Sequence, residues 1–418
     1  MSFSFGFSGD DIEDDGESQE HEALASKISE YTLSEPGKSP PHATIQPQSH
    51  SLAELLASLP SQISYSKLHI PQSTDHGFHD TKTNDNGAET TLFRRSVFDI
   101  RAQLMTEANP SAEEEDVAKT LLSGLESGDL SSGIYEGGFK TWECALDLAS
   151  LVGSDPDLFD RDRTPSALEE DWEVVELGAG SAVPSLALMQ KFLERRKSHH
   201  PARGGGSLRL TLCDYNADVL RLATAPNALL NYLFASGKLA PSLDEGGRDG
   251  DLDLEELGGE PFVNRTIQDM ASDRISIDFI SGGWGPEFLD LINPSSPRGS
   301  GGTGQQHRPA TNLLILASET IYSPSSIRAF SETVRALLSP HSRRPETRTG
   351  LAKALPPKAW VAAKRVYFGV GGGVDEFVRE MDALGGSTRV VMEIKDAGVG
   401  RVVLEVTPPA PPDTTSVS

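Results

Sequence analysis

The stretch VVELGAGS, residues 174–181, decides the fold class of this chain. Its first four residues have the composition of a buried strand, and a glycine turn follows directly. In α/β proteins a glycine turn between a buried strand and a helix often binds a ligand. Four interpretations of this turn are open: a dinucleotide site, a phosphate site, a methyl-donor site, or a turn that binds nothing.

Strands and helices alternate along the chain around this turn. Such alternation predicts a mostly parallel sheet with helices on both faces, which is a Rossmann-like α/β fold. The last two strands are separated only by a short turn, so they predict an antiparallel hairpin at the end of the sheet. The expected strands lie within residues 172–180, 208–216, 275–284, 311–319, 359–369 and 388–407.

The N-terminal part of the chain has a different composition. Eight acidic residues and no Lys or Arg fall within the first 22, and the following segment is rich in Ser, Pro, Gln and His. This predicts disorder, with one short amphipathic helix in SLAELLASLP (51–60). Gly-, Ser- and charge-rich inserts such as 238–260 and 340–357 are expected to be surface loops. The expected organisation is a disordered tail (1–90), a strand and helix extension (91–130), the ligand-binding α/β domain (131–410) and a second disordered tail (411–418).

The overall charge limits the classes of partner. The formal net charge is −25. Non-specific binding to nucleic acid requires a basic surface, so this charge argues against it and suits a basic protein partner, or serves solubility alone. No apolar run reaches about 18 residues, and the N-terminus lacks the pattern of a signal peptide. We expect a monomer in the cytoplasm and nucleus, without membrane contact.

The cysteines and histidines exclude several kinds of site. Cys144 and Cys213 form no disulfide framework, and the ten histidines include no HExxH pattern and no Cys/His cluster. The sequence therefore predicts neither a metal site nor a histidine-based catalytic triad.

The residues around the two glycines separate the ligand classes. A dinucleotide fingerprint needs a third glycine where this chain has Val183, and a P-loop needs a Gly-Lys-Ser/Thr that does not follow. What remains is Glu176, two residues before Gly178 and Gly180, and a second acid, Asp214, at the end of the next strand. Glu176 is placed to accept hydrogen bonds near a cationic amino-acid group, and Asp214 to hold two ribose hydroxyls. The two acids favour S-adenosylmethionine over NAD, and an ordinary tight turn is the alternative.

Three further stretches fall at the same rim of the expected sheet. The first stretch, YEGGFKTWE (135–143), places Trp142 before a helix. The second, SETIY (318–322), ends the fourth expected strand, TNLLILASET. SGGW ends the third strand, where Trp284 can stack on an adenine. Each stretch alone has a structural explanation, such as packing of Trp142 against the sheet edge. Together they favour a ligand site.

At these motifs the chain resembles the protein-histidine methyltransferase family, whose known type modifies a histidine of ribosomal protein uL3. The motifs are GIYEGGFKTWECALDL, DYN followed by PN, SGGW, SETIY and YFGVGGGV (367–374), in this order over about residues 130–408. YFGVGGGV is the most specific, since related lysine methyltransferases share the Trp-Glu and Asp motifs but not usually this glycine run. The resemblance implies a seven-strand methyltransferase sheet and S-adenosyl-L-methionine as cofactor.

The resemblance also implies which residues hold the cofactor. Ser318 would lie near the sulfonium, and Gly283 and Trp284 beside the adenine. Family members often carry Asp where Glu176 stands, and the two long inserts lie outside the family pattern. The implied cofactor-binding residues are Thr141, Trp142, Glu143, Cys144, Ala145, Glu176, Gly178, Gly180, Asp214, Tyr215, Asn216, Gly282, Gly283, Trp284 and Ser318.

Catalysis by such an enzyme depends on alignment and charge placement, because methyl transfer from a sulfonium is an in-line displacement. A neutral imidazole is already a nucleophile near neutral pH, since its pKa is about 6.5. Glu319 and Tyr322 are the candidates for orienting it, with Glu319 accepting the N–H of the non-reacting nitrogen. Glu319 could equally cap the next helix or pair with an Arg. The glycines of YFGVGGGV suit a lid, a backbone-donor nest or a plain turn.

The expected function is methylation of a histidine in a basic ribosomal protein, which the acidic tail helps to attract. A protein-lysine methyltransferase of the same fold is the second interpretation. A non-catalytic S-adenosylmethionine-binding assembly factor is the third. An NAD-dependent oxidoreductase is disfavoured by Val183 and by the lack of a hydride-transfer pair.

Overall fold

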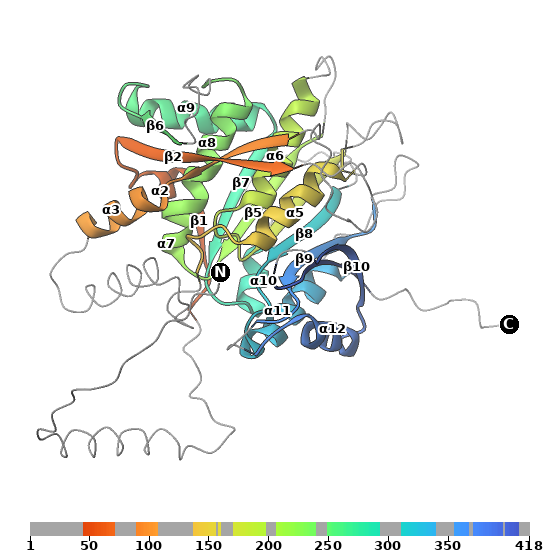
Figure 1. The fold of residues 1–418 in the computed structure, drawn as a ribbon. Helices are drawn as coiled ribbons and strands as arrows, with labels where there is room; N and C mark the ends of the chain where they lie inside the picture. Colours follow the sequence, from red (N-terminus) through yellow and green to blue (C-terminus); the bar gives the residue numbers. More distant parts are fainter. Residues whose placement is uncertain are drawn as a thin grey trace, which may run out of the picture. The chain divides into compact units, whose positions relative to one another are not determined.

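A computed structural model of the chain describes residues 45–71, 89–107, 137–155, 158–159, 170–197, 206–239, 249–292, 311–339, 355–367, 371–395 and 398–408. Its main sheet has eight strands in the order β1-β7-β5-β4-β8-β9-β11-β10 (Figure 1). These strands are β1 (Gln48–Ser51), β4 (Asp171–Leu177), β5 (Leu208–Asp214), β7 (Ile275–Ser281), β8 (Thr311–Ser318), β9 (Lys358–Lys364), β10 (Ser387–Ile394) and β11 (Arg401–Thr407).

The five central strands are parallel, and the C-terminal pair is antiparallel. β7, β5, β4, β8 and β9 run in one direction, while β11 and β10 form an antiparallel hairpin beside β9. The strand order reverses between β4 and β8, so this is the switch point where ligands bind in open α/β sheets. The predicted Rossmann-like fold and its terminal hairpin are confirmed.

Helices cover both faces of this sheet, and each face has its own core. Val174 of β4 packs in the core on the side of α5, α6 and α8, and Val175 in the core on the side of α10, α11 and α12. Because the strand is buried on both sides, its side chains are apolar in sequence rather than alternating. The helices are α5 (Glu143–Ser154), α6 (Val183–Lys197), α7 (Ala217–Val219), the π-helical turn η1 (Leu220–Thr224), α8 (Ala225–Ala235), α9 (Gly259–Ser272), α10 (Pro286–Ile292), α11 (Pro324–Leu338) and α12 (Val374–Ala383).

The prediction of disorder over residues 1–90 is wrong for residues 45–71. Residues from Ile45 onward belong to one compact unit. β1 is an antiparallel edge strand on β7, and α2 (Leu52–Leu56) follows with a capping box formed by Ser51 and Glu54. The predicted short helix in 51–60 is therefore confirmed. QSHS has no apolar periodicity, and it is a strand because the free edge of β7 supplies its hydrogen bonds.

A second sheet of three strands, in the order β3-β2-β6, also lies partly in segments predicted to be unstructured. β6 belongs to the insert 238–260, which the composition assigned to a surface loop. That prediction is wrong for these residues, because Leu252 and Leu254 are buried in the core. Within the expected extension 91–130, a strand and a helix are present up to residue 107, and the rest lies outside the described residues. These elements are β2 (Gln62–Pro71), β3 (Glu89–Arg95), α3 (Val97–Glu107) and β6 (Asp249–Asp253).

Two asparagines of α8 fix the second sheet against the main domain. The side-chain amide of Asn231 binds both the N–H and the C=O of Phe93, at 3.0 and 2.5 Å. The side-chain oxygen of Asn227 accepts the N–H of Arg95 at 2.6 Å. The outer edge of β3 is thus paired by side chains instead of another strand. Unpaired backbone groups at this buried edge would be costly.

Candidate active site

The glycine turn after β4 has the backbone that its sequence requires. Gly178 and Gly180 both have positive φ, at 69° and 51°. A Cβ on Gly178 would lie 2.7 Å from Cγ2 of Thr320, and one on Gly180 would lie 3.0 Å from the carbonyl oxygen of Gly138. The loops after β4 and β8 and the segment before α5 therefore meet here, and only glycine fits at both positions.

Asp214, at the end of β5, ties the turn to the next loop. One carboxylate oxygen accepts the N–H of Gly180 at 2.9 Å, and the other accepts the N–H of Asn216 at 3.1 Å. The residue is nearly buried. Its two oxygens thus hold the backbone of both loops in place. The role predicted for Asp214 stays a prediction, and its role in shaping the turn is visible here.

Glu176 lies beneath the turn and is fully buried. Its Oε2 accepts the N–H of Ser185, in the first turn of α6, at 3.1 Å. Burial raises the pKa of this carboxyl to about 8, although hydrogen bonds from Ser185 act in the opposite direction. Glu176 therefore supports the junction of turn and helix from below. Its predicted contact with a cationic ligand group stays a prediction.

The segment before α5 lies beside the turn, as its motif suggested. The Thr141 hydroxyl donates to Oγ of Ser181 at 3.0 Å, and the indole N–H of Trp142 donates to the carbonyl of Gly137 at 3.0 Å. Trp142 is half-buried and is the N-cap residue of α5. Cys144 and Ala145 are buried under this helix start, while Glu143 is exposed.

The loop after β7 is held by the N-terminal segment. The N–H of Gly282 donates to the carbonyls of Asp214 and Tyr215, at 3.1 and 3.2 Å, and the N–H of Gly283 donates to the carbonyl of Ile45 at 2.9 Å. Trp284 packs against Phe330 of α11, with ring centroids 5.1 Å apart. The predicted stacking of Trp284 on an adenine stays a prediction, because this ring already has a protein partner on the α11 side.

At the end of β8, Ser318 is followed by Glu319, which has a positive φ of 56°. This conformation is rare for a residue with a side chain, and it costs free energy that the surrounding structure must supply. The Glu319 N–H donates to the carbonyl of Ala362 at 2.9 Å. The Glu319 carboxylate accepts the hydroxyl of Tyr367 at 2.6 Å. Neither helix capping nor an Arg partner, the two structural explanations for Glu319, is seen among its described contacts.

Lys364, the last residue of β9, joins two carboxylates at this rim. Its ammonium lies 3.4 Å from Oε1 of Glu319 and 3.1 Å from Oε2 of Glu143. The same ammonium lies 5.0 Å from the ring centroid of Trp142. Burial and the neighbouring Glu319 raise the pKa of the Cys144 thiol, so this cysteine is a neutral neighbour of the cluster.

Tyr322 is fixed through the glycine run of YFGVGGGV. The N–H of Gly372 donates to the carbonyl of Tyr322 at 3.0 Å, and a Cβ on Gly372 would lie 2.3 Å from that oxygen. The N–H of Gly371 donates to the carbonyl of Tyr367. These two donors are therefore not free for a substrate, and the run serves as a close-packed turn into α12. The ring of Tyr322 stands edge-on to that of Tyr367, with centroids 6.4 Å apart.

Two residues of this site were not predicted from the sequence. Lys364 lies in a segment for which the sequence predicted only a strand. Tyr367 lies in the YFGVGGGV motif, of which only the glycines were considered. The signal that could have identified them is their position directly at the carboxyl end of the fifth parallel strand. The site residues that were predicted lie at or near the carboxyl end of a neighbouring strand, or at the start of α5 and directly before it.

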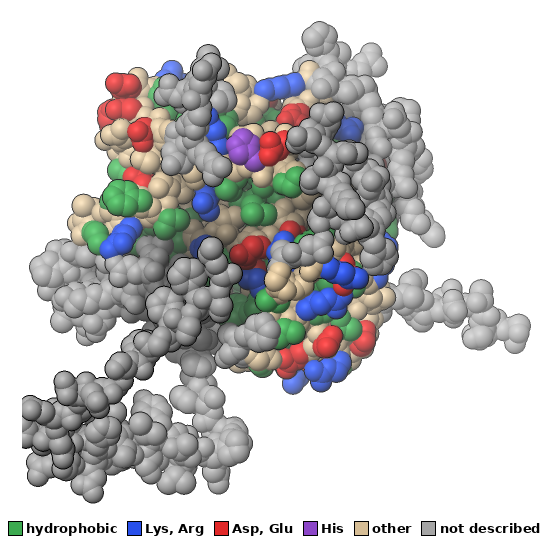
Figure 2. All heavy atoms as spheres, in the orientation of Figure 1, with side chains coloured by type: hydrophobic (Ala, Val, Ile, Leu, Met, Phe, Trp, Pro, Cys, Tyr) green, Lys and Arg blue, Asp and Glu red, His purple; other side chains and the backbone are tan. Residues whose placement is uncertain are grey.

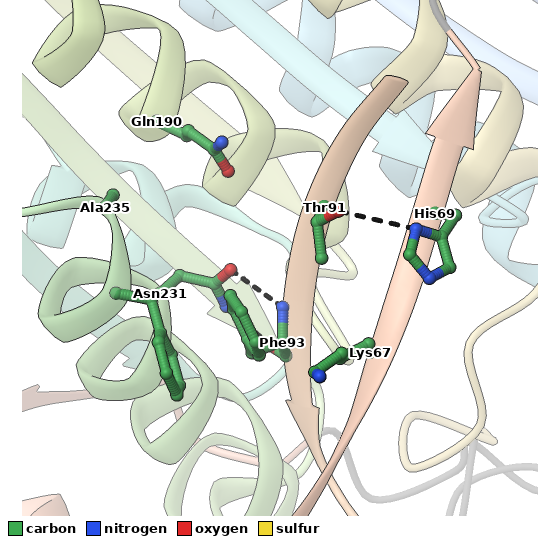
Figure 3. Close-up of a pocket in the computed structure, with 8 residues that line it drawn as sticks. Lys67, His69, Thr91, Phe93, Gln190, Asn231 and Ala235 are labelled. Carbon is green, nitrogen blue, oxygen red and sulfur yellow. Dashed lines mark hydrogen bonds between the residues drawn. The ribbon is translucent and has the colours of Figure 1, made fainter. Parts of the chain in front are cut away.

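A separate cavity of about 390 Å³ lies between the second sheet and helices α6 and α8 (Figure 3). Its walls include Lys67 and His69 of β2, Thr91 and Phe93 of β3, and Asn231 of α8. None of the predicted site residues lines it. We therefore place the chemistry at the carboxyl ends of the strands and not in this cavity.

The described residues contain no group of three or more His, Cys, Asp or Glu placed to hold a metal ion. Cys144 and Cys213 are free and buried. Among the described helices, none is long and apolar enough to cross a membrane.

Comparison with known proteins gives the family. Histidine protein methyltransferase 1 of Saccharomyces cerevisiae is 32% identical over 401 residues, which cover 91% of this chain and 91% of that protein. The protein of the same name from Schizosaccharomyces pombe is 30% identical over 85% of this chain and 84% of its own length. The chain belongs to the histidine protein methyltransferase family.

The rat histidine protein methyltransferase 1 homolog is more distant, at 27% identity over 67% of this chain and 59% of its own length. No family model matches the chain. The resemblance recognised from the motifs is thus confirmed by whole-chain relatives of the same family.

The rim of the sheet fits the adenosine-bearing cofactor expected of a methyltransferase. The side-chain amide nitrogen of Asn216 and the hydroxyl of Thr320 are buried and have no hydrogen-bond partner among the described residues. Buried polar groups are normally paired, so unpaired ones beside a ligand-type turn suit a ligand. Asn216 is one of the residues predicted to hold the ribose and adenine side.

Proposed function

We propose that this chain is an S-adenosylmethionine-dependent protein-histidine N-methyltransferase. The observation that carries the proposal is 32% identity to a histidine protein methyltransferase over 91% of both chains. The residues at the carboxyl ends of β4, β5, β8 and β9 are compatible with it. They combine a close-approach glycine turn, a nearly buried Asp214 and a carboxylate, Glu319, held in a strained conformation.

When bound, S-adenosylmethionine supplies an electrophilic methyl group on a sulfonium. Gly178 and Gly180 allow the backbone to approach the cofactor, and Asp214 keeps the turn in place through its bond to the N–H of Gly180. Asn216 offers an unpaired donor on the adenosine side. Placing the reacting groups in line accounts for most of the rate gain in such a displacement.

Glu319 is proposed to accept the N–H of the non-reacting nitrogen of a substrate imidazole. This hydrogen bond fixes the tautomer and leaves the lone pair of the other nitrogen directed at the methyl group. Tyr367 donates to the same carboxylate, so it holds Glu319 in position. Tyr322 forms the neighbouring wall. The proton left on the product is released to water, since an imidazolium with a pKa near 7 needs no strong base.

The proposed substrate is a basic ribosomal protein, with uL3 as the first candidate. A chain of net charge −25 is matched to a basic partner. Figure 2 shows acidic and basic side chains interspersed on the described face, without a single large basic patch. Such a substrate would place the enzyme in the cytoplasm and nucleus, and we propose that it acts there as a monomer.

The proposal is tested by measuring methyl transfer into ribosomal proteins. These proteins are isolated from cells that lack this enzyme. The chain is incubated with labelled S-adenosylmethionine, and labelled peptides are identified by mass spectrometry. Label on a histidine of uL3 that Asp214→Ala abolishes is expected. Label on a histidine of another protein would support histidine methylation but contradict uL3 as the substrate. Label on lysine would show that the chain is a lysine methyltransferase instead.

The matched control for that experiment is Asp218→Ala. Asp218 is a partly exposed acid in α7 that pairs with Arg221 and follows Asp214 closely in sequence. Its removal leaves the glycine turn intact and should leave labelling unchanged. Bound S-adenosylmethionine without any label would favour the non-catalytic assembly factor.

A further inference from the structure

Three elements bring a compact charged cluster to the rim where the methyl acceptor must enter. Glu143 begins α5, Glu319 follows β8, and Lys364 ends β9. The ammonium of Lys364 lies within 3.4 Å of an oxygen of each carboxylate. The cluster is therefore an ion triad with the cation in the middle, and not a free acidic pocket.

Lys364 is held in this position by more than its charges. Its side chain is 21% exposed, and the ammonium lies near the face of the Trp142 indole. Burial tends to lower the pKa of this lysine, but Glu319 and Glu143 outweigh it and raise the pKa above its usual value. Lys364 is therefore charged throughout the physiological pH range.

Lys140 is a second cation near the cluster: it is exposed, its ammonium lies 4.6 Å from the ring centroid of Trp142, and its charge acts on Glu143. The remaining neighbours are paired or neutral. Asp147 of α5 is paired with Arg401 of β11 by two hydrogen bonds. Burial raises the pKa values of Cys144 and Tyr367, so both are neutral near pH 7. Glu143 is half exposed and is screened by solvent. The charge that faces Glu319 is thus that of Lys364.

We propose that Lys364 sets the substrate class by cancelling the charge of Glu319, so that the pocket accepts a neutral imidazole and rejects a lysine ammonium. This inference rests on the proposed histidine methylation and names what selects for it. An incoming ammonium loses its hydration and needs an unbalanced negative charge in return. Here the resident ammonium of Lys364 already occupies that position.

A neutral imidazole is affected differently. It gives up little hydration energy, and it needs from Glu319 only a lone pair that accepts one N–H. At about 5 Å and an effective dielectric constant of about 20, a like charge at Lys364 lowers the binding of a cation by roughly two orders of magnitude and leaves a neutral ring almost unaffected. Lys364 is therefore a specificity-determining residue that acts through Glu319.

The test measures binding of two small probes, imidazole and methylammonium, to the full chain with S-adenosylhomocysteine present, at about pH 8.5, where imidazole is neutral and methylammonium is charged. Competition is followed by ligand-observed NMR. The unaltered chain and Lys364→Arg are expected to prefer imidazole, because both keep the cation. Lys364→Met and Lys364→Gln are expected to shift the preference towards methylammonium by at least about tenfold. Adding Glu319→Gln to Lys364→Met should remove the gained preference for methylammonium. This result would show that methylammonium binds at Glu319 and not elsewhere on the acidic surface.

An unchanged probe preference in both neutral variants overturns the inference, and so does equal binding of the two probes by the unaltered chain. Thermal unfolding and binding of S-adenosylhomocysteine show that each variant is folded. Two neutral variants are used so that the test still works if one of them does not fold. The proposed function is tested separately, by the label. Label on histidine with an unshifted probe preference overturns the role of Lys364 alone, whereas label on lysine by the unaltered chain overturns both.

Discussion

At the residue scale, the most unusual group is the buried carboxyl of Glu176. Burial raises its pKa to about 8, and the carboxylate accepts a hydrogen bond from the backbone N–H of Ser185. In an unfolded chain a glutamate has a pKa of about 4.5. The folded state therefore binds a proton more tightly than the unfolded state, and the stability that this proton contributes is complete below pH 4.5 and is lost as the pH rises through 8.

Glu176→Gln should make the stability of the cofactor-free chain less dependent on pH. The amide keeps the shape of the protonated acid and cannot ionise. Between about pH 5 and pH 8.5 the unaltered chain is expected to lose up to about 1.4 kcal/mol per pH unit through this group, and the variant should not. Urea unfolding at the two pH values measures the difference. A slope that is equal in both proteins would mean that Glu176 is ionised in the fold.

Gly372→Ala should damage the methyl-acceptor side of the site and spare the cofactor side. The new Cβ would lie 2.3 Å from the carbonyl oxygen of Tyr322, so the Tyr322 loop must move. Overpacking of this kind costs about 1–3 kcal/mol, and we expect kcat/KM to fall at least about tenfold. Gly285→Ala is the control, because nothing lies within 4 Å of its Cβ. Equal activity of both variants would contradict a close-packed loop.

At the element scale, the N-terminal strand β1 extends the sheet and supports the loop after β7. The carbonyl of Ile45 accepts the N–H of Gly283, and a Cβ on Gly282 would lie 2.6 Å from Cα of Pro47. His50 reaches Ser281 with a hydrogen bond of 2.8 Å. A segment more than two hundred residues away in sequence thus forms one wall beside the expected adenine position.

Removing residues 1–51 should weaken cofactor binding, whereas removing residues 1–44 should not. The longer deletion takes away β1 and the partner of Gly283, and the shorter one leaves both. Losing the strand and the hydrogen bond is expected to raise the Kd for S-adenosylmethionine about tenfold and to lower Tm. Calorimetric titration compares the two truncated chains. Equal affinities would show that β1 only pairs with the edge of β7 and does not support cofactor binding.

At the scale of the whole molecule, charge is the dominant property. Eight of the acidic residues lie within the first 22 of the chain, ahead of the described structure. A long acidic segment joined to an acidic domain attracts a basic protein at low ionic strength, and salt weakens the attraction because the Debye length falls to about 8 Å at physiological ionic strength.

Deleting residues 1–44 should raise KM for the basic protein substrate several-fold at low salt and have little effect at about 0.5 M salt. The value of kcat is expected to stay the same, because the site residues described above all lie outside residues 1–44. Initial rates at a series of salt concentrations provide the measurement. An unchanged KM at low salt would remove the tail from substrate binding.

The sequence alone was sufficient for the five parallel strands, the C-terminal hairpin and most of the rim. The buried strand before Gly178 and Gly180, the acid two residues before that turn and the acid after the next strand are local patterns, and the parallel order of strands brings them together without further information. The family followed from short motifs at the same strand ends.

Only the tertiary structure showed that β1 is a strand, that Glu176 is turned under α6, and that Lys364 lies between Glu143 and Glu319. QSHS forms a strand because β7 has a free edge, and an isolated lysine in a strand gives no sign of its two partners. Periodicity and turn residues act between near neighbours in sequence, so they determine elements and their order. Edge pairing, burial of a charge and ion triads depend on groups far apart in the chain, which only the folded packing brings within a few ångströms.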